Sequence, residues 1–201
     1  MCQPWTLYIP NPPHLIYGMS CWGRNDAGQI GDGTTDDALW VTAVSNLDKP
    51  SDLVAGGLNH TCATQGTGLS CWGDNGFGQL GDNSTVDHLT PNPVPGLSHV
   101  SALAAGVYFT CAATGTETYC WGWNSYGQLG VGDTQTHRSP TQVPALSGLQ
   151  VEELTAGLQH ACARLSDGSL RCWGNNGKGQ LGDGTANDAH EPVAVADPYE
   201  P

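Results

Sequence analysis

The stretch Cys71-Trp72-Gly73-Asp74-Asn75-Gly76-Phe77-Gly78-Gln79-Leu80-Gly81 is one of four copies of the same phrase in this chain. The copies begin at Cys21, Cys71, Cys120 and Cys172 and end at Gly31, Gly81, Gly130 and Gly182. Starts that lie 49 to 52 residues apart are typical of propeller blades or of a similar stacked repeat. Because a repeat of this kind does not bury its apolar face alone, the array is expected to fold as one unit.

Two further phrases extend the repeat and predict its strands. Upstream, short apolar runs at 53–55, 103–105 and 154–156 each lead into an Ala-Gly phrase, and they predict an inner strand buried on both faces. Residues 60–64 and 69–72 then predict two strands around the turn at Gly66-Thr67-Gly68. Downstream, recurring Pro and Val at 93–94, 140–143 and 192–195 predict an outer edge strand, where proline is tolerated. The sequence therefore predicts an all-β fold with a four-stranded blade in each repeat.

The repeated Cys-Trp-Gly-x-Asn-x-x-Gly-Gln-Leu-Gly phrase, preceded three times by Ala-Gly, resembles the repeats of the regulator of chromosome condensation family over about residues 45–195. The resemblance implies a β-propeller of seven blades, which at this period needs roughly 350 residues. This chain has 201 residues, a single array with repeats at about 1–44 (incomplete), 45–94, 95–143 and 144–195 and a tail at 196–201. We interpret it as part of a longer propeller; the alternative is a short variant closed by dimerisation. Open blade edges would also favour self-association.

The first repeat departs from the pattern. Residues 1–20 contain no Ala-Gly phrase, and Met1 to Trp5 and Asn11 to Pro13 are expected to be irregular. The same segment has neither a basic start nor an apolar core, so it does not have the features of a signal peptide.

Composition and charge restrict the possible partners. The chain has 28 Gly, 13 Pro and a net charge of −13, from 19 acidic and 6 basic residues without a clustered run. Because phosphate binding needs clustered Lys and Arg, nucleic acid is not expected as a partner. A basic protein partner would be attracted, although the charge is also explained by the solubility of an exported protein. No apolar run reaches the ~18 residues of a membrane span.

Six cysteines occur as pairs across the predicted hairpins. Facing residues of two antiparallel strands are within disulfide reach, so a bridge is predicted in three repeats, with buried free cysteines as the alternative. The pairs are Cys62 with Cys71, Cys111 with Cys120 and Cys162 with Cys172. Cys2 and Cys21 form a less regular pair, and Cys2 is equally consistent with a free thiol. Bridges persist in oxidising compartments, which predicts an extracellular or cell-surface protein; reduced cysteines would mean an intracellular one.

No catalytic, metal or cofactor site is predicted. The chain lacks Cys-x2–4-Cys zinc spacing, the alternating Asp ligands of a calcium loop and the Gly-x-Ser-x-Gly elbow. Its Asp-Gly clusters are interpreted as turn residues, and the chain is not expected to be an enzyme.

Function is instead expected in the loop positions that differ between repeats. Aromatic residues at these positions are typical of interaction hot spots, although they are equally expected to pack on neighbouring loops. The candidate partner-binding residues are Phe77, Trp123 and Tyr126, with Arg24 and Lys178 at the rim. The predicted function is non-enzymatic protein binding through one face. The alternative that the resemblance implies is guanine-nucleotide exchange on a small GTPase, for which no matching loop is found.

Overall fold

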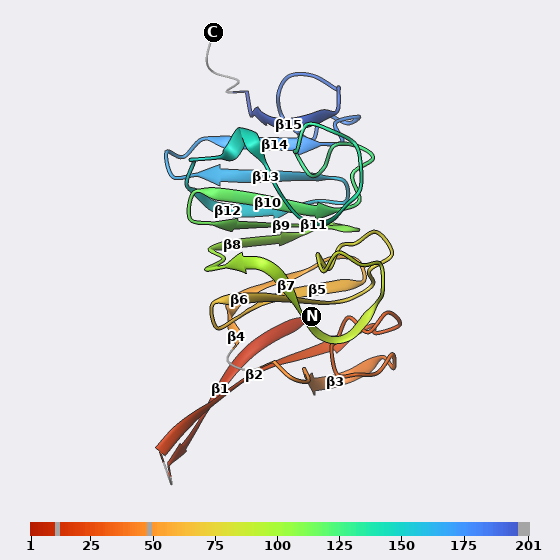
Figure 1. The fold of residues 1–201 in the computed structure, drawn as a ribbon, viewed down its shortest axis with the longest axis vertical. Coiled ribbons are helices and arrows are strands. Elements are labelled where there is room, and N and C mark those ends of the chain that lie inside the picture. Colours follow the sequence, from red (N-terminus) through yellow and green to blue (C-terminus); the bar gives the residue numbers. More distant parts are fainter. Residues whose placement is uncertain (11–12, 48–49, 197–201) are drawn as a thin grey trace.

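The computed structural model describes residues 1–10, 13–47 and 50–196. These residues form four antiparallel sheets that follow one another along the molecule, with the first and last sheets at opposite ends (Figure 1). We call the sheets blades 1 to 4. Blade 1 contains β1 (Cys2–Pro10), β2 (Pro13–Gly23) and β3 (Ala38–Ala43). Blade 2 contains β4 (Pro50–Gly56), β5 (His60–Gln65), β6 (Gly68–Gly73) and β7 (His88–Ser98).

The remaining blades repeat the order of blade 2. Blade 3 contains β8 (Ala102–Ala105), β9 (Phe109–Thr114), β10 (Glu117–Gly122) and β11 (His137–Gln142). Blade 4 contains β12 (Val151–Ala156), β13 (His160–Leu165), β14 (Leu170–Gly174) and β15 (Ala189–Ala194). A single 3-10 turn, Pro144–Leu146, lies between blades 3 and 4. The all-β prediction is confirmed, and blades 2 to 4 have the predicted four strands in sequence order.

Every cysteine is in a cross-strand disulfide. The register places Cys62 opposite Cys71, and the same alignment recurs in the other blades. The four bonds join Cys2 to Cys21, Cys62 to Cys71, Cys111 to Cys120 and Cys162 to Cys172, with Cα atoms 4.0–4.1 Å apart. The predicted hairpin bridges are present, and the pair left open in blade 1 is bonded as well. Four disulfides suggest an oxidising compartment.

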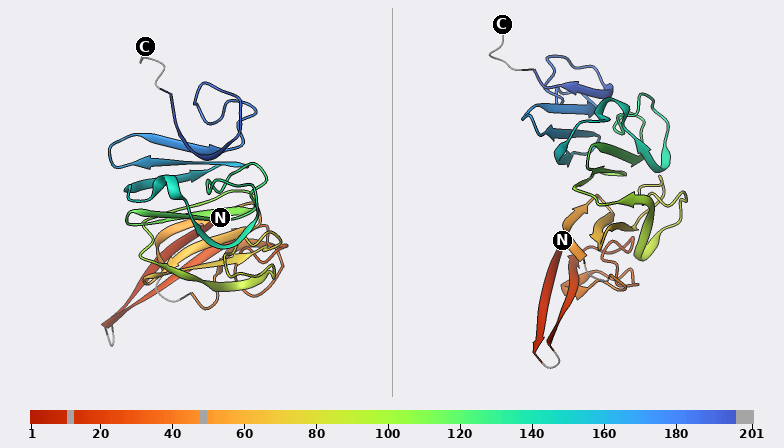
Figure 2. Two further views of the ribbon diagram at one scale, coloured as in Figure 1. Left: turned by 45° about the horizontal axis from the view of Figure 1, so that its top comes forward. Right: turned by 60° about the vertical axis from the view of Figure 1, so that its left-hand side comes forward.

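The expectation of irregular structure at the N-terminus was wrong for the residues that the structure describes. β1 and β2 pair from Cys2 with Cys21 to Pro10 with Pro13, and this long hairpin projects away from the other sheets (Figures 1 and 2). The physical reason lies in residues 5–9, which are Trp, Thr, Leu, Tyr and Ile, all types that favour strands. Asn11 and Pro12 lie outside the described residues. Since Cys2 of β1 takes the place of Cys62 of β5, blade 1 lacks a counterpart of the innermost strand β4 in the described part of the chain.

The inner strands are less buried than predicted. Leu53, Val54 and Ala55 are half-buried, and in β12 only Val151 and Leu154 are buried. Both faces of the strand were expected to be covered, which these residues are not. The ends of the three inner strands and the turns that follow them line a shallow hollow of about 360 Å³.

Buried tryptophans mark the junctions between blades. Trp72, Trp121 and Trp173 are each 0% exposed and belong to the three clusters of apolar core residues, whereas Trp22 of blade 1 is half-buried. Among the described residues, no helix is long and apolar enough to cross a membrane.

Candidate functional site

A buried asparagine organises the long loop between the last two strands of each blade. In blade 2, the Asn75 side chain donates from Nδ2 to Asp82 Oδ1 at 3.1 Å and accepts at Oδ1 from the N–H of Leu80 at 3.0 Å. Its own N–H donates to Asp87 Oδ1 at 2.8 Å. The equivalent asparagines Asn25, Asn124 and Asn176 are also 0% exposed, and each accepts at Oδ1 the N–H of the residue five positions on. Asn25 and Asn176 also repeat the two aspartate bonds of Asn75, whereas Asn124 donates from Nδ2 to Asp133, nine residues on. Each loop therefore has one fixed framework, and the residues between the fixed positions are free to vary.

The aspartates of these loops are used within the turns, as the sequence predicts. Burial alone would raise the pKa of Asp82, but hydrogen bonds from Ser84, Asn75 and His88 outweigh it and lower that pKa. The His88 Nε2 to Asp82 Oδ2 distance is 2.8 Å. In the described part of the chain, no three His, Cys, Asp or Glu side chains are grouped so that they could hold a metal ion.

Four aromatic side chains from two adjacent blades meet on the loop side of the molecule. Phe77 of blade 2 lies 5.0 Å from Tyr108 and 5.9 Å from Trp123 of blade 3, between ring centroids. Trp123 in turn lies 6.2 Å from Tyr108 and 5.6 Å from Tyr126, both in edge-on geometry. Phe77 is 39% exposed and the other three are half-buried. We call Phe77, Tyr108, Trp123 and Tyr126 the aromatic cluster.

The β9–β10 register explains why Tyr108 joins the cluster. Trp123 donates its N–H to the Tyr108 carbonyl at 2.8 Å, directly beyond the pair formed by Phe109 and Gly122. The same backbone bond joins Asp74 to Asn59 in blade 2 and Asn175 to Gln159 in blade 4. Sequence reasoning missed Tyr108 because it treated the Ala-Gly phrase as fixed. The available signal was an aromatic residue where the other two repeats have an amide.

Two buried glutamines hold the aromatic residues of the loops in place. Gln79 Oε1 accepts the N–H of Phe77 at 2.9 Å, and Gln128 Oε1 accepts the N–H of Tyr126 at 2.9 Å. Both glutamines are 0% exposed. Because these bonds fix the backbone two residues upstream, the rings of the aromatic cluster are attached to a rigid support.

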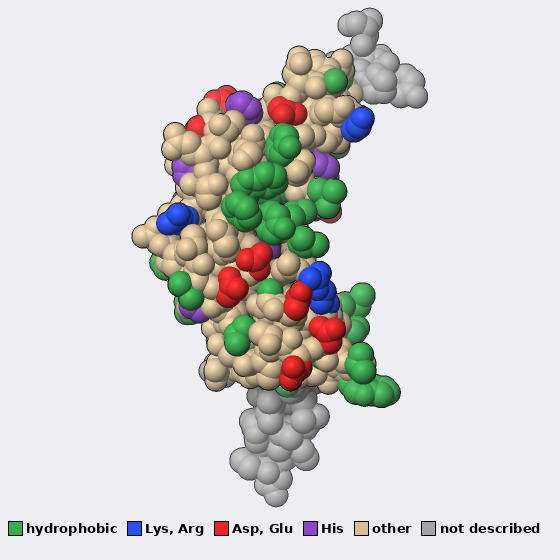
Figure 3. Space-filling model, turned by 90° about the vertical axis from the view of Figure 1, so that its right-hand side faces the viewer, with side chains coloured by type: hydrophobic (Ala, Val, Ile, Leu, Met, Phe, Trp, Pro, Cys, Tyr) green, Lys and Arg blue, Asp and Glu red, His purple; other side chains and the backbone are tan. Residues whose placement is uncertain are grey.

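The two basic candidates lie on other blades. Arg24, in the blade 1 loop, is paired with Asp26, and the hydrogen bond from Arg24 lowers the pKa of that carboxyl. Lys178 is exposed in the blade 4 loop. Figure 3 shows the loop side of the molecule, where hydrophobic side chains gather near the middle with acidic side chains beside them. The structure thus brings three of the five candidates together and adds Tyr108, while Arg24 and Lys178 lie on either side along the row of blades.

Models of one protein family match most of the chain. A model of the regulator of chromosome condensation (RCC1) repeat matches residues 70–113, 117–164 and 167–200. A second model with the same description matches residues 151–180.

Solved structures with the same arrangement of sheets are also similar to this chain. Human WBSCR16 is 25% identical with a TM-score of 0.76, over 91% of this chain and 49% of that protein. Prp20p from Saccharomyces cerevisiae, described together with its binding to Gsp1p and histones, is 19% identical with a TM-score of 0.77, over 92% of this chain and 48% of that protein. Yeast RCC1 bound to Kap60 gives the same identity and TM-score. The present chain spans about half the length of these proteins.

Proposed function

The chain belongs to the regulator of chromosome condensation (RCC1) repeat family, and on that premise we propose that it is a non-enzymatic protein-binding propeller that works outside the cell or at its surface. Its binding surface is the aromatic cluster, with Arg24 and Lys178 as peripheral contacts. The observation that carries the proposal is the convergence of four aromatic rings from two blades on a rigid, partly exposed support.

The chemistry of the aromatic cluster suits a protein partner. Trp and Tyr are enriched at interaction hot spots because a rigid ring buries much apolar area at little cost in conformational entropy. Rings that are held by Gln79 and Gln128 lose little further freedom when a partner binds. In the other loops, the position of Phe77 holds Ala27 and Lys178, so only neighbouring blades 2 and 3 supply this surface.

The proposed location rests on the disulfides. A cytosolic protein would keep these cysteines reduced, whereas four cross-strand bonds, one in each blade, are stable in secreted proteins and ectodomains. Guanine-nucleotide exchange on a small GTPase remains the alternative, since Prp20p is described with its binding to Gsp1p. At 19% identity that likeness shows the fold alone. Self-association through open blade edges stays a separate prediction.

The proposal is tested by affinity capture with a matched pair of variants. The disulfide-intact chain, a Phe77→Ala/Trp123→Ala variant and a Leu149→Ala/Leu170→Ala control are immobilised, and extracellular fluid from the native source is passed over each. Leu149 and Leu170 are 38% and 45% exposed and lie in blade 4 or just before it. Proteins that the wild-type chain and the control retain are identified by mass spectrometry, purified, and titrated against all three.

We expect the cluster variant to bind at least about thirtyfold more weakly, because truncating a hot-spot residue costs about 2 kcal/mol or more. If a partner binds the Phe77→Ala/Trp123→Ala variant as tightly as the Leu149→Ala/Leu170→Ala control, its binding surface lies elsewhere on the chain. Accelerated release of labelled GDP from a small GTPase, lost on reduction of the chain, would favour nucleotide exchange instead.

A further inference from the structure

Two Asn-x-Thr sequences occur in this chain, and in an extracellular protein such a sequence is an acceptor for an N-linked sugar. One is Asn59-His60-Thr61, which runs into β5, and the other is Asn83-Ser84-Thr85, in the loop between β6 and β7. The sugar is attached to the amide nitrogen of the asparagine, and the acceptor sequence also requires the hydroxyl of the third residue. A usable acceptor must therefore present both side chains to solvent.

The loop of blade 2 presents both side chains of the second sequence. Asn83 and Thr85 are exposed, and neither side chain has a hydrogen-bond partner in the described part of the chain. Ser84, between them, is fixed instead: its Oγ accepts a hydrogen bond from Asn75 Nδ2 at 3.1 Å and one from the N–H of Val86 at 3.2 Å. The two groups that a transferase needs are thus accessible on a loop whose backbone is held in place.

The position of Asn83 is occupied by glycine in the other three blades. Asn83 has a φ of 63°, and Gly33, Gly132 and Gly184 have φ of 91°, 88° and 80°. Asparagine is among the few residues that tolerate this left-handed conformation, so it can replace glycine without disturbing the loop. Blades 1 and 3 also have a threonine two positions further on. The replacement of glycine by asparagine is therefore what completes the acceptor sequence in blade 2.

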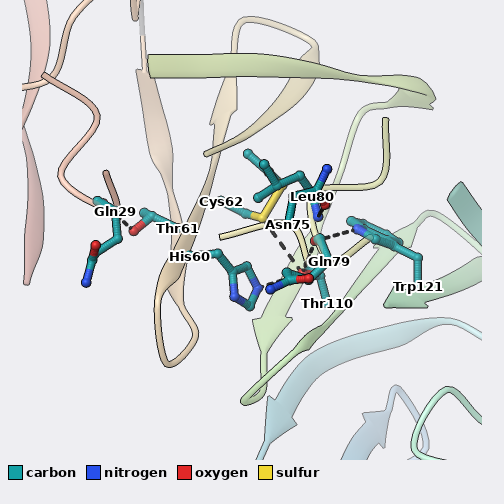
Figure 4. Close-up of a disulfide and its surroundings, with 10 residues drawn as sticks. Gln29, His60, Thr61, Cys62, Asn75, Gln79, Leu80, Thr110 and Trp121 are labelled. Atoms are coloured by element: carbon teal, nitrogen blue, oxygen red, sulfur yellow. Dashed lines mark hydrogen bonds between the residues drawn. A yellow bond between two sulfur atoms is a disulfide. The ribbon is translucent and has the colours of Figure 1, made fainter. Parts of the chain in front are cut away.

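The first sequence is enclosed by the junction between blades 1 and 2. Thr61 is 5% exposed, and its hydroxyl donates to the Gln29 carbonyl of blade 1 at 2.8 Å (Figure 4). Asn59 is half-buried, with its Oδ1 shielded from solvent. The bridge between Cys62 and Cys71 begins at the next residue and holds this strand against β6. Because the Thr61 hydroxyl is buried and already bonded, the folded chain does not offer this sequence as an acceptor.

We propose that Asn83 carries an N-linked oligosaccharide and that Asn59 does not. The donor is an oligosaccharide joined to a lipid through a diphosphate. The Asn83 amide nitrogen attacks the anomeric carbon of the first sugar, and a C–N bond forms as the bond from that carbon to the diphosphate oxygen breaks. The lipid diphosphate leaves with the bonding electrons, the amide proton passes to a base of the transferase, and no atom is oxidised or reduced.

The proposal rests on the proposed location outside the cell, because disulfides form in the lumen of the secretory pathway, where this transfer takes place. It does not depend on the aromatic cluster or on a protein partner. A sugar at Asn83 adds a bulky, solubilising group to the blade 2 loop and leaves the core contacts of the fold unchanged, because Asn83 is exposed.

The first test examines the native protein. The protein is isolated from its source without reduction, digested, and treated with peptide N-glycosidase in water labelled with heavy oxygen, which converts a glycosylated asparagine into labelled aspartate. We expect the label on the peptide that contains Asn83 and not on the peptide that contains Asn59. Alkylation of the same sample before digestion counts the free thiols.

The second test uses variants that cultured eukaryotic cells secrete with the same cleavable leader, and it measures the mass of the intact chain before and after removal of sugar. Asn83→Gly copies the glycine of the other blades and should lose the oligosaccharide, as should Thr85→Ala. Thr85→Ser is the matched control, because it keeps the hydroxyl and should keep the sugar.

A gain of the modification tests whether the loop position decides. Gly33→Asn completes the same acceptor sequence in the blade 1 loop, where Thr35 is exposed and a Cβ on Gly33 would lie 3.7 Å from a Thr90 methyl group. We expect this variant to carry a second oligosaccharide. Circular dichroism confirms that each variant is folded.

Four results would overturn the proposal: an unmodified Asn83, a sugar that Asn83→Gly does not remove, equal modification of Asn59 and Asn83, or a folded Gly33→Asn chain with no second oligosaccharide. An unmodified Asn83 in a native chain with all four bridges would overturn this proposal alone. An unmodified Asn83 in a chain with free thiols would overturn the proposed location as well.

Discussion

Blades 1 and 3 carry the same repeated phrase but present it in opposite surroundings. In blade 3, Trp121 is 0% exposed between two neighbouring blades, and its loop contributes to the aromatic cluster. In blade 1, Trp22 is half-buried and the equivalent loop positions hold Asp26 and Ala27. Both loops nevertheless have a fully buried asparagine, Asn25 or Asn124, that accepts the N–H of the residue five positions on. The comparison teaches that the repeat fixes the framework within a blade, while the neighbouring blade decides what is buried.

The largest expected loss of stability tests whether the neighbouring blade decides how much a repeated tryptophan contributes. Trp121→Ala should lower the free energy of unfolding by about 3–5 kcal/mol, because it leaves a cavity at the junction and removes the bond to Gln79. Trp22→Ala should cost about 1 kcal/mol or less, because half-buried positions lose less contact. Guanidinium unfolding of dilute chain, followed by circular dichroism, measures both. Equal losses would mean that Trp22 is supported within its own blade.

The junction between blades 2 and 3 contains a buried histidine that should make the stability of the fold depend on pH. His60 is buried, and its Nε2 lies 3.0 Å from Thr110 Oγ1 across that junction (Figure 4). Because Thr110 donates its hydroxyl hydrogen to the Gln79 carbonyl, His60 Nε2 donates to Thr110 Oγ1. Burial lowers the pKa of His60 to about 4.

The unfolded chain has the ordinary histidine pKa of 6.5 and binds a proton at higher pH than the folded chain, so stability falls as the pH drops from about 6.5 to about 4. The total loss at this site should be roughly 3 kcal/mol. His60→Phe, which copies Phe109 of blade 3, should remove most of this dependence. His160→Phe should change it less, because His160 is only half-buried. Unfolding at several pH values provides the measurement, and an unchanged slope in His60→Phe would contradict the assignment.

Substitution of the loop asparagines should show where blades 1 and 3 are alike. Asn25→Ala and Asn124→Ala should each cost about 1–3 kcal/mol, because each leaves the N–H of Ile30 or Leu129 without its acceptor. Only Asn124→Ala should also weaken partner binding, since its loop carries Trp123 and Tyr126. Calorimetric unfolding and partner titration separate the two effects. A much larger loss at Asn124 than at Asn25 would mean that the framework depends on the neighbouring blade.

The smallest effect is expected at the outer strands. Leu39→Ser should change the stability of the dilute monomer by less than about 0.5 kcal/mol, as is usual for an exposed position. Leu89→Ser should cost more, because Leu89 covers Gly28 of the preceding blade. Thermal unfolding of the two variants at low concentration measures both losses of stability. A larger loss for Leu39→Ser than for Leu89→Ser would mean that β3 makes stabilising contacts that its exposure does not show.

Most of the fold was predictable from the repeat. The hairpin strands, the outer strands and the cross-strand cysteine pairs all follow from positions that recur at a fixed spacing, because antiparallel pairing converts sequence separation into register. The N-terminal hairpin was missed because residues 1–20 do not follow the repeat, although their composition favours strands. The half-exposed inner strands were missed because a short apolar run does not reveal whether a second layer covers it.

The candidate site was predictable in part. Phe77, Trp123 and Tyr126 occupy variable loop positions that the alignment of repeats exposes at once. Tyr108 is separated from Trp123 by a full hairpin, and only the pairing of β9 with β10 shows that the two are neighbours.

The sequence by itself determined the all-β repeat, the blade of paired strands and the disulfide pattern, since each depends on contacts within one repeat. Tertiary structure alone decided which copy of a residue is buried. Trp22 and Trp121 have the same local sequence, yet burial is a property of the packed neighbour and not of the residue. For the same reason, only the stacked blades brought the aromatic cluster together.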